Sequence, residues 1–130
     1  MIDYLRVAAA ATGKFGVTDC ATLVIGWLDN VTGRDGMSEW AGRYHDEQSC
    51  EAFIAGGGGY ERIADDFLRE TYGVARASVP ADGNPVLARF AGTLAMGLRA
   101  PGGVVAMRLQ RGLIMTRRTE VVAEWGHPCS

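Results

Sequence analysis

Cys20 is the residue best placed to do chemistry, because it follows a potential helix cap and opens an amphipathic segment. Thr18 or Asp19 can serve as that N-cap. A cysteine in the first turn of a helix faces unpaired backbone N–H groups and the positive end of the helix dipole. Both lower the pKa of a thiol and favour the nucleophilic thiolate. Asp19 acts in the opposite direction, since a neighbouring carboxylate raises a thiol pKa, and its expected role is the helix cap.

Nucleophilic chemistry at Cys20 requires a general base, and the sequence offers two histidines. His45 lies in a polar stretch, where a solvated loop histidine is the usual case. His127 is close to the C-terminal end and reaches Cys20 only if the terminal segment folds across the start of the helix. We therefore expect Cys20 to be a packing residue at the head of a core helix. Altered thiol chemistry, with His127 as base, and metal ligation are the alternatives.

The remaining residues indicate neither a metal site nor a phosphate site. The three cysteines and two histidines lack the matched spacing of four zinc ligands. The four glycines at positions 56–59 are followed by Tyr60 and Glu61, whereas a phosphate-binding P-loop ends in Gly-Lys-Ser/Thr. We expect no cofactor and no metal, and we assign the glycine run to the end of a helix.

The elements that must position Cys20 are helical over the first two-thirds of the chain. The clearest predicted helix covers residues 20–31, where apolar residues recur every three or four positions and Gly33 supplies a left-handed end. We expect it to be the most buried helix, with Trp27 on its core face. Further helices are predicted over residues 2–11, 46–55 and 60–72, with a helical turn over 38–41.

The last third of the chain reads as short strands separated by glycine and proline. The predicted strands cover residues 86–90, 93–98, 104–109, 113–116 and 120–125, and a meander of hairpins is their simplest connection. Helices followed by an antiparallel sheet define an α+β fold in which the N-terminal helices pack on the C-terminal sheet. No linker or repeat divides the chain, so residues 1–130 are expected to form one domain.

Several short motifs resemble a known group of proteins. The segment TDCATLV at 18–24, with Trp27, resembles the nucleophile region of the NlpC-type cell-wall peptidases, which are papain-like cysteine peptidases. More closely, the chain resembles a phage and prophage family related to them. The further matching features are Thr32-Gly33 with Asp35, Gly42-Arg43-Tyr44, the glycine run at 56–59, and Trp125.

The resemblance implies a papain-like fold, with Cys20 at the nucleophile position. In the NlpC-type pattern the histidine base opens a sheet strand shortly after a Gly-Asp turn. Here the corresponding turn is at residues 82–85, and the strand after it reads TLAMGL, without histidine. The resemblance therefore implies a cysteine-peptidase-like domain that has lost its catalytic base.

The resembling proteins are tail-tip components of long-tailed phages and of phage-like gene transfer agents. This implies a structural, non-catalytic domain of a virion tail tip, made in the host bacterial cytoplasm and bound to hub or distal tail proteins. One alternative is an active cysteine peptidase or amidase that cleaves cell-wall peptides, which would make peptidoglycan a partner. Another is a tail assembly factor absent from the mature particle.

Composition and charge narrow the classes of partner. The formal net charge is -2, and no basic cluster extends beyond Arg117-Arg118, so we expect no nucleic-acid binding. No apolar run approaches the ~18 residues that span a bilayer, so we expect no membrane span. The first residues lack the basic start and apolar core of a signal peptide, which predicts a chain that begins in the cytoplasm.

A partner surface is predicted from apolar residues that fall outside the periodic helix faces. Exposed aromatic residues and methionines are enriched where proteins meet. The expected partner-binding residues are Met37, Trp40, Tyr44 and the hairpin around Pro101.

Overall fold

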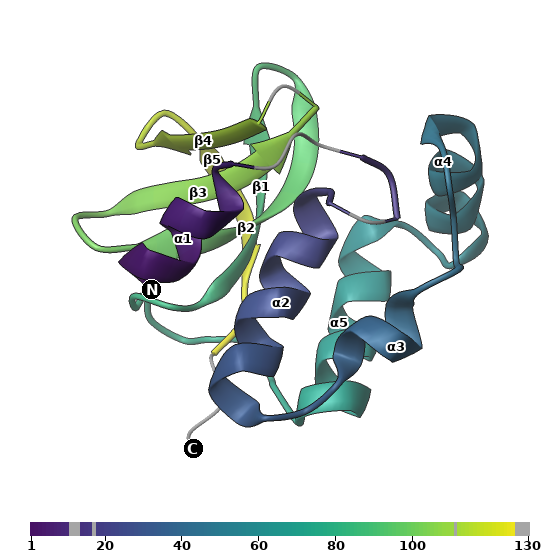
Figure 1. Cartoon of the computed structure of the whole chain (residues 1–130), viewed down its shortest axis with the longest axis horizontal. Helices are drawn as coiled ribbons and strands as arrows, with labels where there is room; N and C mark the ends of the chain where they lie inside the picture. Colours follow the sequence, from purple (N-terminus) through teal and green to yellow (C-terminus); the bar gives the residue numbers. More distant parts are fainter. Residues whose placement is uncertain (11–13, 17, 111, 127–130) are drawn as a thin grey trace.

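The chain places its helices before its strands, as the sequence predicts, and the fold is α+β (Figure 1). The computed structural model describes residues 1–10, 14–16, 18–110 and 112–126. The helices in these ranges are α1 (Ile2–Ala8), α2 (Cys20–Thr32), α3 (Gly36–Trp40), α4 (Glu47–Gly56) and α5 (Tyr60–Tyr72). The strands are β1 (Pro85–Phe90), β2 (Thr93–Ala100), β3 (Val104–Leu109), β4 (Gly112–Thr116) and β5 (Glu120–Glu124). None of the described helices is long and apolar enough to cross a membrane.

The helix boundaries follow the capping residues of the sequence. Asp19 caps α2 and Asp46 caps α4, in each case by accepting a hydrogen bond from a backbone N–H three residues on. Gly33 ends α2 in the left-handed conformation, with φ at 73°. The predicted first helix is shorter than expected, since α1 ends at Ala8.

The strands form one antiparallel sheet with the order β4-β3-β2-β1-β5. The first four strands follow the expected meander, but β5 does not pair with β4. It returns to the other edge and pairs with β1, where the register shifts between Leu87 and Ala88. Turn residues in the sequence predict only pairing between neighbouring strands. The pairing of β5 with β1 depends on side-chain packing at a distant sheet edge, so these signals do not reveal it.

The principal core lies between the sheet and α2, which packs on β2 and β3 (Figure 1). Leu23 and Leu28 are fully buried there, and α5 adds Phe67 and Leu68. Trp27 packs against the principal core, as predicted, but it is only half-buried. Its ring also contacts Tyr4 of α1 in a tilted arrangement, with 5.6 Å between ring centroids.

The predicted exposure of Trp40 and Tyr44 is wrong. Their exposed fractions are only 5% and 6%, because Trp40 packs edge-on against both Phe53 of α4 and Phe67 of α5. Trp40 also donates a hydrogen bond from Nε1 to the Tyr44 hydroxyl. A helix as short as α3 has too few residues for its buried face to be recognised by periodicity. These two residues are therefore core residues.

The other two expected partner residues remain at the surface to different degrees. Met37 is half-buried against the principal core. Pro101 is exposed in the turn between β2 and β3, together with Gly102 and Gly103. Of the predicted partner surface, the hairpin around Pro101 alone is fully accessible.

Candidate functional site

Asp19 holds the segment that carries Cys20 in place. Its buried carboxylate accepts hydrogen bonds from the backbone N–H groups of Gly16 and Thr22, at 2.8 and 2.9 Å, and from the Tyr44 hydroxyl. The Thr22 hydroxyl in turn accepts a hydrogen bond from the Asp19 backbone N–H at 2.8 Å. The predicted role of Asp19 as helix cap is confirmed. Because the Asp19 carboxylate accepts these three hydrogen bonds, we assign it a structural role.

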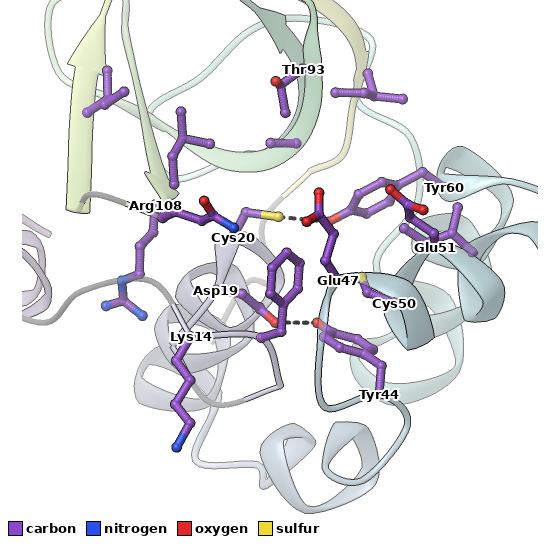
Figure 2. A pocket seen from close by; sticks show the side chains of 17 residues that line it. Lys14, Asp19, Cys20, Tyr44, Glu47, Cys50, Glu51, Tyr60, Thr93 and Arg108 are labelled. Atoms are coloured by element: carbon purple, nitrogen blue, oxygen red, sulfur yellow. Dashed lines mark hydrogen bonds between the residues drawn. The ribbon is translucent and has the colours of Figure 1, made fainter.

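Cys20 is the first residue of α2, as predicted, and its thiol faces Tyr60, the first residue of α5. The distance between Cys20 Sγ and the Tyr60 hydroxyl is 2.9 Å, which is a hydrogen bond for sulfur (Figure 2). The starts of α2 and α5 therefore meet at this pair. The sequence gives no sign of the contact, since forty positions separate the two residues.

The surroundings of Cys20 favour the neutral thiol. Burial raises its pKa, and the negative charge of Asp19 raises it further. The hydrogen bond from Tyr60 and the backbone amides of Met96 and Ala21 act in the opposite direction but are outweighed. At neutral pH the sulfur is protonated, and a protonated thiol is a poor nucleophile.

A pocket of about 540 Å³ opens beside this thiol (Figure 2). Its volume is within the range of small-ligand and peptide sites. Its walls come from the loop before α2, from α4, from the start of α5 and from β2, β3 and β4. The lining residues are Lys14, Phe15, Asp19, Cys20, Tyr44, Glu47, Cys50, Glu51, Ile54, Tyr60, Thr93, Leu94, Ala95, Arg108, Leu109, Gln110 and Ile114.

None of the described residues that line this pocket is a histidine. His45 lies elsewhere, with 84% of its side chain exposed and Nε2 at 3.4 Å from the Asp46 carboxylate. The predicted solvated position of His45 is therefore confirmed. His127 lies outside the described residues. The start of β2 faces the pocket with Thr93, Leu94 and Ala95, which cannot accept a proton from Cys20.

Charged residues surround the pocket in an arrangement that the sequence analysis missed. Glu47 and Glu51 stand one turn apart on α4, whereas Lys14 and Arg108 lie on the opposite side of Cys20 (Figure 2). Arg108 occupies an inward position of β3, and an arginine within an otherwise apolar strand, VVAMRL, was the available signal. The acidic pair at positions 47 and 51 was a second signal, since residues four apart share a helix face.

Cys50 is a second thiol in the pocket lining. Burial is the main cause that raises its pKa, to about 11, and the charge of Asp19 contributes. Among the described residues, no group of three or more His, Cys, Asp or Glu side chains is arranged to hold a metal ion. The charged and apolar side chains of the pocket lining suit binding by shape, apolar contact and charge.

Comparison with known proteins places the chain in one family. A family model described as a domain of unknown function, DUF6950, matches residues 1–127. No curated protein and no solved structure matches the chain.

Proposed function

The chain belongs to the DUF6950 family, and from that premise we propose that it is a structural component of a phage, prophage or gene-transfer-agent tail tip. In this proposal it is a cysteine-peptidase-like domain without catalytic activity, bound to hub or distal tail proteins. The tail-tip assignment rests on the resemblance of the segments around Cys20, Gly42 and Trp125 to phage proteins.

One observation supports the proposed lack of catalytic activity, namely the surroundings of the Cys20 thiol. Cys20 keeps the position of a nucleophile at the start of α2, but its pKa is raised and the described pocket residues offer no imidazole. A peptidase of this type needs a thiolate and a base within hydrogen-bond reach. A neutral thiol hydrogen-bonded to a tyrosine supplies neither.

Incubation of the purified chain with cell-wall peptides tests the catalytic part of this proposal. We expect no cleavage above the rate of the Cys20→Ser variant, since the Cys20 thiol is neutral and no described pocket residue can act as its base. Turnover that is lost in both Cys20→Ser and His127→Ala would establish the alternative, an active peptidase with His127 as its base.

Mass spectrometry of purified particles tests the structural part. We expect the chain to be present in mature particles in a fixed ratio to the hub protein. Its presence in assembly intermediates together with its absence from mature particles would instead identify an assembly factor.

A further inference from the structure

The pocket beside Cys20 has unpaired charges of opposite sign on its two sides. Glu47, Glu51 and Lys14 are exposed, and none of them forms an ion pair with another described residue. Elsewhere in the molecule, acidic residues such as Asp65 and Glu124 are paired with arginines. The charges at the pocket are thus free to meet a ligand.

Arg108 is the strongest indication that a ligand is involved. Only 7% of its surface is exposed, and a guanidinium so deeply buried is normally paired with a carboxylate. Among the residues that the structure describes, it makes one hydrogen bond, from Nη2 to the backbone carbonyl of Ala8 at a long 3.3 Å. Its Nε has no hydrogen-bond partner among these residues. An unsatisfied buried donor costs about 1–3 kcal/mol, so an acceptor brought by a ligand would stabilise the Arg108 guanidinium in the pocket wall.

Apolar side chains also line the pocket. Phe15, Ile54, Leu94 and Ile114 are among them, and the neutral thiol of Cys20 adds to this surface. A ligand that fits therefore carries a cation at the α4 side, an apolar group over Cys20 and a carboxylate at the side of Lys14 and Arg108. A short extended stretch of polypeptide presents such groups in this order.

We propose that this pocket binds, without cleaving it, a peptide segment of a partner protein that carries a basic, an apolar and an acidic side chain in succession. The inference rests on the proposed function, because a tail component needs a contact with its neighbours. The Cys20 pocket is then the docking site for one of them. The pocket offers far less surface than the ~800 Å² per partner of a standard interface, so the segment is one part of a larger contact.

Selection from a displayed library of random peptides, about twelve residues long, against the full chain tests the proposal. We expect the enriched peptides to share a Lys or Arg separated by apolar residues from an Asp or Glu. Their affinity should fall at least about tenfold for the Glu47→Lys, Glu51→Lys double variant, since attraction at the α4 side becomes repulsion. Glu47 lies in the first turn of α4, so Glu47→Lys should lower the melting temperature slightly, and a single cooperative unfolding transition confirms that the variant is folded.

A matched control variant changes the same total charge away from the pocket. Glu70→Lys with Glu120→Lys alters two side chains that are each 72% exposed, and peptide affinity should stay unchanged. As a rescue, peptides in which the basic residue is replaced by Glu should regain affinity for the Glu47→Lys, Glu51→Lys variant.

Two kinds of result would overturn the inference. One is failure of the charge pattern, seen either as selected peptides without a shared pattern or as equal affinity for the pocket variant and its control. The other is displacement of the selected peptides by a cell-wall stem peptide that binds more tightly, which would identify the pocket as a wall-binding site. Neither result alters whether the chain is present in purified particles, so failure of this inference and failure of the tail-tip proposal are distinguishable.

Discussion

Two physical effects compete at Cys20. The helix N-terminus stabilises a thiolate, but its electrostatic contribution reaches only about 2 kcal/mol, even in partly buried sites. Desolvation of a buried anion is larger, and the nearby carboxylate of Asp19 adds to it. The balance favours the protonated thiol. A position at the start of a helix is therefore insufficient evidence for a reactive cysteine.

Titration of Cys20 by alkylation rate measures this balance. In a Cys50→Ser, Cys129→Ser background we expect Cys20 to react slowly at neutral pH, with a pKa above the ~8.5 of a free thiol. Tyr60→Phe removes a hydrogen bond that lowers the Cys20 pKa, so the pKa should rise further. Fast labelling at pH 7 by the Cys50→Ser, Cys129→Ser form would contradict the non-catalytic reading.

At the scale of elements, the edge strand β5 is tied to the rest of the sheet by a charged group. The Glu124 carboxylate reaches past β1 to Arg99 on β2, with 2.6 Å between Oε1 and Nη2. Its Oε2 also accepts a hydrogen bond from Asn84 at 2.8 Å. Glu124 and Arg99 have only 12% and 16% of their side chains exposed, so solvent screens this pair less than a surface pair.

The stability of the fold should consequently depend on the ionisation of Glu124. Burial opposes its ionisation, but the hydrogen bonds from Arg99 and Asn84 outweigh burial and hold its pKa below the ordinary value. A pKa lowered in the folded state adds stability that is fully present above the unfolded pKa of about 4.3. That stability is lost as the pH falls through the folded pKa.

Urea unfolding as a function of pH tests this dependence. Below about pH 4.3, the free energy of unfolding of the unmodified chain should fall more steeply than that of Glu124→Gln. Glu120→Gln, at an exposed position of the same strand, should keep the steep dependence. Identical slopes for the unmodified chain and Glu124→Gln would show that the Glu124 pair does not contribute.

Local signals in the sequence predict most of the elements but few of their contacts. The helix over residues 60–72 is predicted to the residue, because its apolar spacing is regular and Gly73 ends it. The burial of Trp40 and the return of β5 to β1 depend on partners far along the chain. The candidate site shows the same division: Cys20 and its cap are readable locally, whereas Tyr60 and Arg108 join them only through tertiary packing.

At the scale of the whole molecule, Trp125 joins the helical layer to the sheet. It follows β5, and its backbone N–H donates to the Pro85 carbonyl at 2.9 Å. Its indole Nε1 donates to the Asp65 carboxylate of α5 at 2.8 Å, and the Arg76 guanidinium lies over the ring at 4.9 Å from the centroid. The side chain is 1% exposed. Trp125 thus connects the helical layer to the sheet through contacts with both.

Replacement of the two tryptophans should have unequal effects on stability. Trp125→Ala removes a fully buried ring and leaves Asp65 without one donor, so we expect a loss of about 3–5 kcal/mol. Trp27→Ala should cost less, because its ring is half-buried and contacts the short helix α1.

Urea unfolding of both variants measures the difference, and Trp125→Phe replaces Trp125→Ala if the latter does not fold. Since Phe fills most of the space but cannot donate to Asp65, it should still lose about 1–3 kcal/mol. If Trp27→Ala proved more damaging than either change at Trp125, the layers would be held together at α1 rather than at the end of β5.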